Sequence, residues 1–176
     1  YVLIGFNELS INMIRELYDE CPSARILLMS GMESATVRHR IQSALPVEVE
    51  RQVLVYFGNI ESIEELQRLN IESAIEVYVL GDEERYGRDA KNIAIVHLVS
   101  ALRGKCSDGK MMPVYVQFDS IPSYSNIQKM NLPPEVFCIE GKPNIFFRPF
   151  NLHENLARQL WSLYGADCER RYDPLD

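Results

Sequence analysis

Cysteine and histidine are scarce in this chain, and neither residue type forms a cluster. No two cysteines have the C-x-x-C spacing, so the pattern indicates neither a zinc site nor a disulfide framework. We therefore expect reduced thiols and a cytoplasmic location. The residues concerned are Cys21, Cys106, Cys138, Cys168, His39, His97 and His153.

Long runs of basic or of apolar residues are also missing. The net charge is −7 and the isoelectric point is near 5.1, which argues against a nucleic-acid partner because phosphate binding requires clustered Lys and Arg. No apolar run reaches the ~18 to 20 residues that span a bilayer, and the first residues lack the order of a signal peptide. The chain starts inside an expected strand and without Met. We expect one soluble domain excised from a longer protein.

The common catalytic motifs are absent as well. There is no G-x-S-x-G elbow, no H-E-x-x-H pair, no Walker lysine and no Tyr-x-x-x-Lys pair, since Tyr124 is followed four residues later by Gln128. This lack counts against an enzyme without excluding one.

What the chain does contain is an alternation of strand and helix patterns. Its 176 residues are 47% hydrophobic and 24% charged, as is usual for one globular domain. The repeated β-α order predicts a Rossmann-like, doubly wound, mainly parallel sheet with helices on both faces, with its core over residues 1–118. Strand patterns end at Gly5 and cover 25–30, 53–57, 74–80 and 114–118; helix patterns follow Gly5 and cover 34–44, 60–69 and 87–102.

After residue 118 the pattern changes. Residues 119–176 are expected to form a C-terminal extension that packs on the same domain. Apolar segments 136–139 and 145–148 flank the turn-rich residues 140–144, so they either join as a hairpin or link edge elements. A last helix is expected at about 153–164.

Three apolar runs end in glycine, at Gly5, Gly58 and Gly81. In a doubly wound sheet, ligands bind outside the carboxyl ends of the strands, so these turns are expected to line one crevice. A single glycine at a strand end is explained by a turn that needs positive φ. Three of them in an alternating order favour a nucleotide-type site.

The first turn only partly matches the dinucleotide fingerprint. The positions of G-x-G-x-x-G are filled by Gly5, Asn7 and Ser10, so backbone N–H groups at a helix N-terminus are expected to face a phosphate. A side chain at Asn7 narrows the close approach that glycine permits.

The second strand lacks the expected acid for a ribose. Ser30 stands at its tip and the nearest acid is Glu33. Arg38 and Arg40 follow, so NADP is possible, although arginines on a helix are commonly plain surface charges. Asp82 begins an acidic run after the fourth strand, suited either to a ribose or cation or to the following helix dipole.

Four segments together resemble the TrkA-N type of NAD-binding domain, the regulator-of-potassium-conductance (RCK) domains of channels and potassium uptake systems. The resemblance covers about residues 1–118, and the segment Phe147–Leu152 looks more like relatives in larger ion-channel proteins. The segments are Val2-Leu-Ile-Gly-Phe-Asn-Glu-Leu-Ser-Ile11, Phe57-Gly-Asn-Ile-Glu61, Leu66-Gln-Arg-Leu-Asn-Ile71 and Tyr78-Val-Leu-Gly-Asp82.

The resemblance implies a regulatory domain that binds NAD or a related nucleotide, or an ion. It implies a homodimer or ring coupled to a channel or transporter portion of the same parent protein, at the cytosolic face of a membrane. In the family pattern Gly5, Asn7 and Ser10 would face the phosphates, Ser30 or Glu33 the ribose, Gly58 and Asn59 the adenine side, and Gly81 and Asp82 the remaining half. Glu8 also belongs to the expected cofactor-binding set.

Two other functions stay open. One is a fragment of an NAD(P)-dependent oxidoreductase whose substrate domain lies elsewhere. The other is a degenerate structural domain that dimerises without a ligand.

Overall fold

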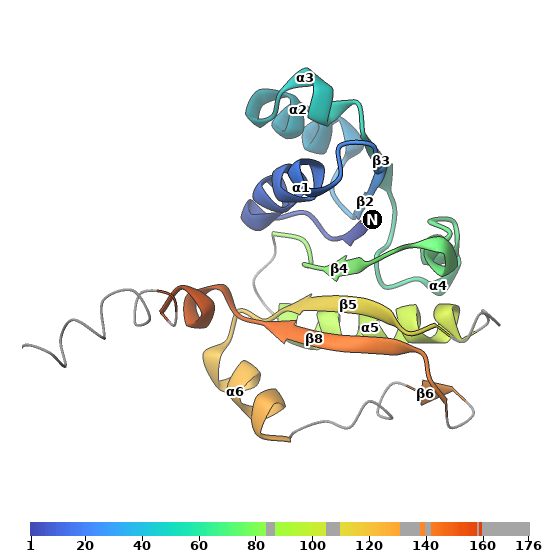
Figure 1. The fold of residues 1–176 in the computed structure, drawn as a ribbon, viewed down its shortest axis with the longest axis vertical. Helices are drawn as coiled ribbons and strands as arrows, with labels where there is room; N and C mark the ends of the chain where they lie inside the picture. Colours follow the sequence, from blue (N-terminus) through green and yellow to red (C-terminus); the bar gives the residue numbers. More distant parts are fainter. Residues whose placement is uncertain (84–86, 105–109, 131–137, 140–141, 158, 160–176) are drawn as a thin grey trace, which may run out of the picture.

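The predicted Rossmann-like fold is confirmed. A computed structural model describes residues 1–83, 87–104, 110–130, 138–139, 142–157 and 159. In this part of the chain the main sheet has six strands, all parallel, in the order β3-β2-β1-β4-β5-β8 (Figure 1). The strands are β1 (Val2–Ile4), β2 (Ile26–Ser30), β3 (Val53–Phe57), β4 (Val77–Val79), β5 (Met112–Gln117) and β8 (Ile145–Phe150).

The chain winds outward from β1 to β3 and then returns to lay β4 on the other side of β1. The point between β1 and β4 is therefore the topological switch point, where ligands of such sheets bind. Strands β1 and β4 are buried throughout, as expected for parallel strands covered on both faces.

Helices cover both faces of the sheet. One core lies between the sheet and the helices α1 (Glu8–Glu20), α2 (Ser34–Ala44) and α3 (Val47–Glu50), and contains Ile14, Val37 and Val49. The other core contains Leu66, Val96 and Tyr124. It lies under α4 (Ile63–Gln67), the 3-10 helix η1 (Ile71–Ser73), α5 (Arg88–Arg103) and α6 (Ile121–Met130).

Several elements differ from the sequence patterns: α3 and η1 are not predicted, and the helix expected over 60–69 is shortened to α4. The strand expected over 74–80 is shortened to β4, because the chain forms η1 just before it and Ile75 is 66% exposed. The patterns do not predict α6, whose sequence buries only Tyr124. A helix with one buried side chain leaves almost no apolar periodicity to detect.

The C-terminal third contributes a strand to the main sheet. Residues 145–150 form β8, which pairs with β5 along its whole length. A short antiparallel pair precedes it, β6 (Cys138–Ile139) with β7 (Lys142–Pro143). Part of the expected strand 136–139 lies outside the described residues. The last helix begins at 152, with Asn151 accepting a hydrogen bond from the Glu154 backbone, and its expected end at 164 also lies outside them.

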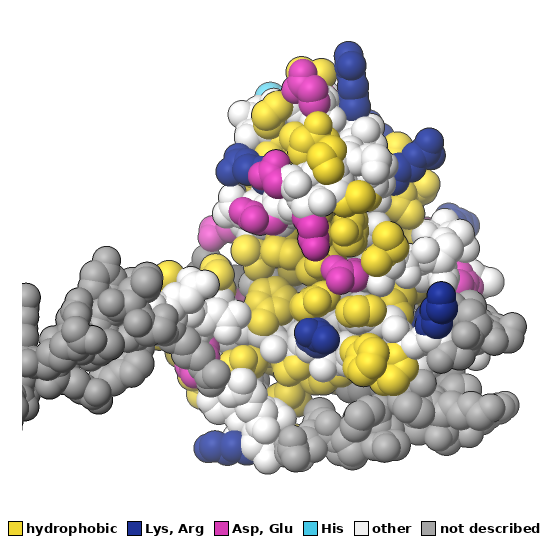
Figure 2. Space-filling model, in the orientation of Figure 1, with side chains coloured by type: hydrophobic (Ala, Val, Ile, Leu, Met, Phe, Trp, Pro, Cys, Tyr) yellow, Lys and Arg dark blue, Asp and Glu magenta, His cyan; other side chains and the backbone are white. Residues whose placement is uncertain are grey.

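One half of the sheet has an open face. In Figure 1 no helix stands in front of β5 and β8, and Figure 2 shows hydrophobic side chains gathered over this region. Tyr78 and Tyr115 stack there at 4.8 Å, and the guanidinium of Arg148 lies 5.7 Å from the Tyr115 ring centre. Phe146 on β8 is 45% exposed. This apolar surface, centred on Tyr115, is called the open face below.

Over the described residues, no helix has both the length and the apolar character that crossing a membrane requires.

Candidate functional site

The N-terminus of α1 is capped by its own side chains. The Asn7 Oδ1 accepts a hydrogen bond from the Leu9 backbone N–H at 2.9 Å, and the Ser10 hydroxyl accepts one from the Asn7 N–H at 2.9 Å. The Ser10 N–H donates to the Asn7 carbonyl at 3.0 Å. Three N–H groups that would face a phosphate in a dinucleotide-binding turn thus have partners within the chain.

The Asn7 amide nitrogen ties this turn to the next strands. It donates to the carbonyl oxygens of Leu80 and Gly81 at 3.0 and 3.2 Å, and to Gln117 Oε1 at 3.0 Å. Asn7 is 5% exposed. It therefore occupies the crevice between β1, β4 and β5 as a structural side chain.

Gly5 and Gly81 lie against each other at the switch point. Both have positive φ, 94° and 72°, a region that favours glycine. A Cβ added to Gly5 would lie 2.2 Å from the carbonyl carbon of Gly81. The two strand-end turns therefore meet backbone to backbone, and we call this contact the crossing.

Asp82 follows the crossing, and its carboxylate accepts three hydrogen bonds. Oδ1 accepts from the Phe6 N–H at 2.9 Å and from the Ser30 hydroxyl at 2.6 Å, and Oδ2 accepts from the Gly31 N–H at 2.9 Å. The Ser30 oxygen in turn accepts from the Met32 N–H at 3.0 Å. These three donors, from Phe6, Ser30 and Gly31, are called the cradle. They form an anion site at the ends of β1 and β2 that a carboxylate of the chain itself fills.

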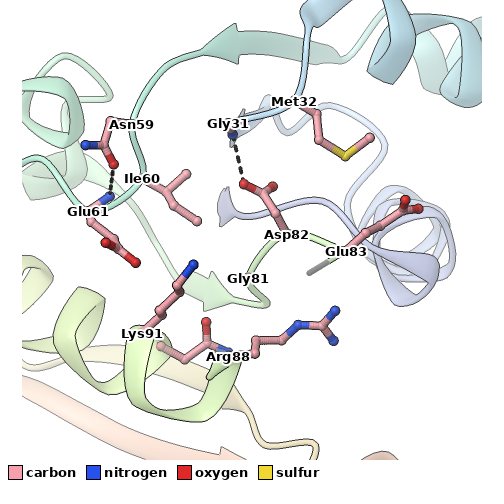
Figure 3. Close-up of a pocket in the computed structure, with 11 residues that line it drawn as sticks. Gly31, Met32, Asn59, Ile60, Glu61, Gly81, Asp82, Glu83, Arg88 and Lys91 are labelled. Carbon is pink, nitrogen blue, oxygen red and sulfur yellow. Dashed lines mark hydrogen bonds between the residues drawn. The ribbon is translucent and has the colours of Figure 1, made fainter. Parts of the chain in front are cut away.

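A cavity of about 380 Å³ lies beside the cradle (Figure 3). We call it the Asp82 cavity. Its walls come from residues 31–32, 59–61 and 81–83 and from the first turns of α5, which contribute Arg88, Lys91 and Asn92. Figure 3 shows the Asp82 carboxylate on one wall and Ile60 and Lys91 across from it.

A second cavity, of about 680 Å³, lies on the other side of the crossing. We call it the Asp119 cavity; its walls include the start of α1, residues 117–119 and the first residues of the last helix. Arg88 lines both cavities and is 6% exposed. Its Nη1 lies 2.8 Å from Asp119 Oδ2. An exposed ion pair between Arg40 and Glu83 also joins α2 to the loop that borders both.

Several predicted site residues do line these cavities. Asn59, Gly81 and Asp82 line the Asp82 cavity, whereas Asn7 and Glu8 line the Asp119 cavity. The predicted site is therefore divided by the crossing into two parts.

The other predicted site residues have different surroundings. Gly5, Ser10 and Ser30 are buried: Gly5 is part of the crossing, Ser30 is part of the cradle, and the Ser10 hydroxyl bonds the Asn7 N–H. Glu33 is exposed and precedes α2 without a side-chain capping bond. Gly58 faces the side chains of Met29 and Glu65, and it lines neither of the two cavities.

The sequence patterns do not point to the α5 residues of the Asp82 cavity. Arg88, Lys91 and Asn92 follow a strand-end glycine and begin a helix, which is the signal that would have placed them at the crevice.

The crevice does not fit the pyrophosphate of a dinucleotide. Such a group needs glycines that allow close approach and free N–H groups at the first helix. Here Asn7 and Ser10 are buried in the turn, and the Asp82 carboxylate holds the N–H groups of Phe6 and Gly31.

No protein-family model matches this chain, and no curated protein matches it either. Membership of the TrkA-N family thus stays a prediction.

Proposed function

We propose that this chain is a regulatory, non-catalytic domain that binds a small ligand of the adenine nucleoside or nucleotide class in the Asp82 cavity. Binding changes how two copies of the domain pair. The parent protein in this proposal is a channel or transporter with the domain on its cytosolic side, in keeping with the resemblance to RCK domains.

The observation that carries the proposal is the position of the Asp82 cavity. It lies at the carboxyl ends of β2, β3 and β4, beside the switch point, where open α/β sheets bind ligands. Its volume of about 380 Å³ falls at the small end of ligand pockets. Apolar side chains of Met32 and Ile60 and polar groups of Asn59 and Asp82 line the same space, as is typical of such pockets.

The open face supports the pairing part of the proposal. It leaves Phe146 45% exposed on β8, which pairs with β5, the strand that carries Tyr115, and exposed apolar patches of this kind mark interaction surfaces. A ligand shifts a pairing equilibrium only by its differential affinity for the two arrangements, typically ~1 to 3 kcal/mol.

Calorimetric titration of the 176-residue chain with adenosine, AMP, ATP, NAD, NADH and NADP tests the proposal. At least one of these compounds should bind. Met32→Trp should weaken the affinity for that compound at least tenfold, because the larger side chain fills the cavity. Met130→Trp is the matched control, since Met130 is 66% exposed on α6. The ligand should also change the sedimentation coefficient. If none of the six compounds binds at millimolar concentration, the ligand proposal is wrong.

A structural pairing domain without a ligand is the second candidate. The filled cradle and the open face favour it together, because the chain satisfies its own anion site and still exposes an apolar surface. It predicts a dimer whose sedimentation no nucleotide changes. A dinucleotide oxidoreductase is disfavoured by the same filled cradle.

A further inference from the structure

We infer that Asp82 sets the ligand class of this domain. In this inference, which rests on the proposed function, the Asp82 cavity takes a nucleoside-like molecule whose hydroxyl donates to the Asp82 carboxylate. No phosphate enters the cradle, because the carboxylate already holds the place that a phosphate would take.

The cradle has the chemistry of a phosphate site. Two backbone N–H groups and one hydroxyl converge on Asp82 within 2.6 to 2.9 Å. One of them, the Phe6 N–H, immediately precedes the Asn7 cap of α1, where the helix dipole favours negative charge. Asp82 therefore supplies from the β4 side the negative charge that a bound phosphate would bring.

The carboxylate keeps one acceptor site on the cavity side. Each carboxylate oxygen accepts about two hydrogen bonds. Oδ1 accepts two, from Phe6 and Ser30, whereas Oδ2 accepts one within the described residues, from Gly31. Because Asp82 and Gly31 both line the Asp82 cavity, Oδ2 is placed to accept from a ligand. A ribose hydroxyl is a donor of the required kind, and a carboxylate at the tip of β2 is where dinucleotide folds place a ribose acid.

The same carboxylate disfavours a phosphorylated ligand. A phosphate monoester carries about −1.5 to −2 charges at neutral pH, and a like charge within a few ångström is repelled. Glu61 and Asp82 carry negative charge on the walls, against Arg88 and Lys91, whereas the charge of Glu83 is paired with Arg40. Arg88 already lies 2.8 Å from an oxygen of Asp119, so its charge is largely compensated.

The apolar part of the cavity suits a base. Met32 and Ile60 line it from separate loops, and Figure 3 shows the Ile60 side chain directed toward the cavity. A flat heterocycle between them places an attached sugar within reach of the strand ends that carry Asp82.

The test compares adenosine with AMP by calorimetry on the wild-type chain and on Asp82→Ala. Wild type should bind adenosine at least as tightly as AMP. Asp82→Ala should reverse the order and bind AMP roughly tenfold tighter than adenosine, because the vacated cradle offers three donors to the phosphate. Inorganic phosphate should raise the melting temperature of this variant alone, at ionic strength matched with chloride.

Asp89→Ala is the matched control. The Asp89 carboxylate also accepts backbone hydrogen bonds, from Asp119 and Ser120 at 2.8 and 3.2 Å, but it lines neither cavity. Its loss should leave the ratio of adenosine to AMP affinity as in wild type. An equal reversal in both variants would overturn the inference.

The outcomes separate the inference from the proposed function. If the wild-type chain binds no adenine compound, the proposed function fails. If wild type binds AMP tenfold tighter than adenosine, the inference fails while the proposed function stands. Should Asp82→Ala not fold, Asp82→Asn keeps the shape and removes the charge. Asp82→Asn should then lower the ratio of adenosine affinity to AMP affinity. An unchanged ratio would contradict the inference.

Discussion

The crossing and the Asp82 cavity lie side by side at the same edge of the sheet, yet they differ in how far their polar side chains are exposed to solvent. At the crossing, Gly5 and Gly81 touch through their backbones and Asn7 is bonded on both ends of its amide. In the cavity, Asn59 and Lys91 are exposed on the walls. The chain thus leaves an open cavity beside its switch point, while its own side chains fill the place where dinucleotide-binding folds hold a phosphate.

The strongest test of the closed crossing is Gly5→Ala. The added Cβ would clash with the Gly81 backbone at 2.2 Å, and alanine would have to adopt a φ of 94°. No side-chain movement relieves the clash or the unfavourable φ. We expect a loss of more than about 4 kcal/mol in the free energy of unfolding. Urea denaturation followed by circular dichroism measures it.

Gly87→Ala is the control for this change. Gly87 also has positive φ, but a Cβ there meets no atom of the described residues within 4 Å, so only the backbone penalty of about 1 kcal/mol remains. Equal losses of stability in Gly5→Ala and Gly87→Ala would show that the turns at Gly5 and Gly81 do not touch.

Asn7→Ala should have the next largest effect. It removes the cap of α1 and leaves buried oxygens of Leu80 and Gly81 without their amide donor. The expected loss is about 2 to 4 kcal/mol. Ser62→Ala removes a cap of α4 at 3.3 Å and a bond from the same hydroxyl to Glu64, and it should cost only about 0.5 to 1 kcal/mol. A loss at Asn7 no larger than at Ser62 would contradict the closed crossing.

Ser30→Ala tests the cradle itself. The change removes the 2.6 Å bond to Asp82 and the acceptor for the Met32 N–H, which together should cost about 1 to 3 kcal/mol. Its effect should be much smaller in an Asp82→Ala background, because the two side chains share a bond. Additive losses in this double-mutant cycle would mean that the two residues do not act together.

Arg40→Ala should have the smallest effect. Arg40 and Glu83 are 45% and 40% exposed, and exposed ion pairs contribute ~0 to 1 kcal/mol. Arg68→Ala, at the exposed pair with Glu65, should behave alike. If Arg40→Ala alone lowered the free energy of unfolding by more than about 2 kcal/mol, the loop at the border of the cavity would contribute to stability as the crossing does.

Much of the fold follows from the sequence. Buried parallel strands produce continuous apolar runs such as 26–30, and helices produce i, i+4 stripes such as Ile14 with its neighbours. The cap at Asn7 is set by a local turn, and the convergence of Gly5 with Gly81 follows from the rule that parallel strands end at one edge of the sheet, so both could be expected from the sequence. The pairing of β8 with β5 could not be predicted, because a short apolar run does not reveal which strand it pairs with.

The central feature of the site could not be predicted. The missing acid at the tip of β2 is supplied by Asp82, which is distant in sequence and reaches Ser30 and Gly31 only after β4 is laid beside β1. Spacing within one motif contains no sign of such a replacement. Ser30, which stands where an acid was expected, was the one local indication.

The amide signals of Phe6 and Gly31 test the central claim most directly, since their N–H groups are the two backbone donors of the cradle. In two-dimensional NMR spectra, titration of the wild-type chain with inorganic phosphate should leave both signals in place. In Asp82→Ala both should shift together and saturate as phosphate enters the cradle. Shifts of the same size in wild type, or no shifts in the variant, would contradict the account.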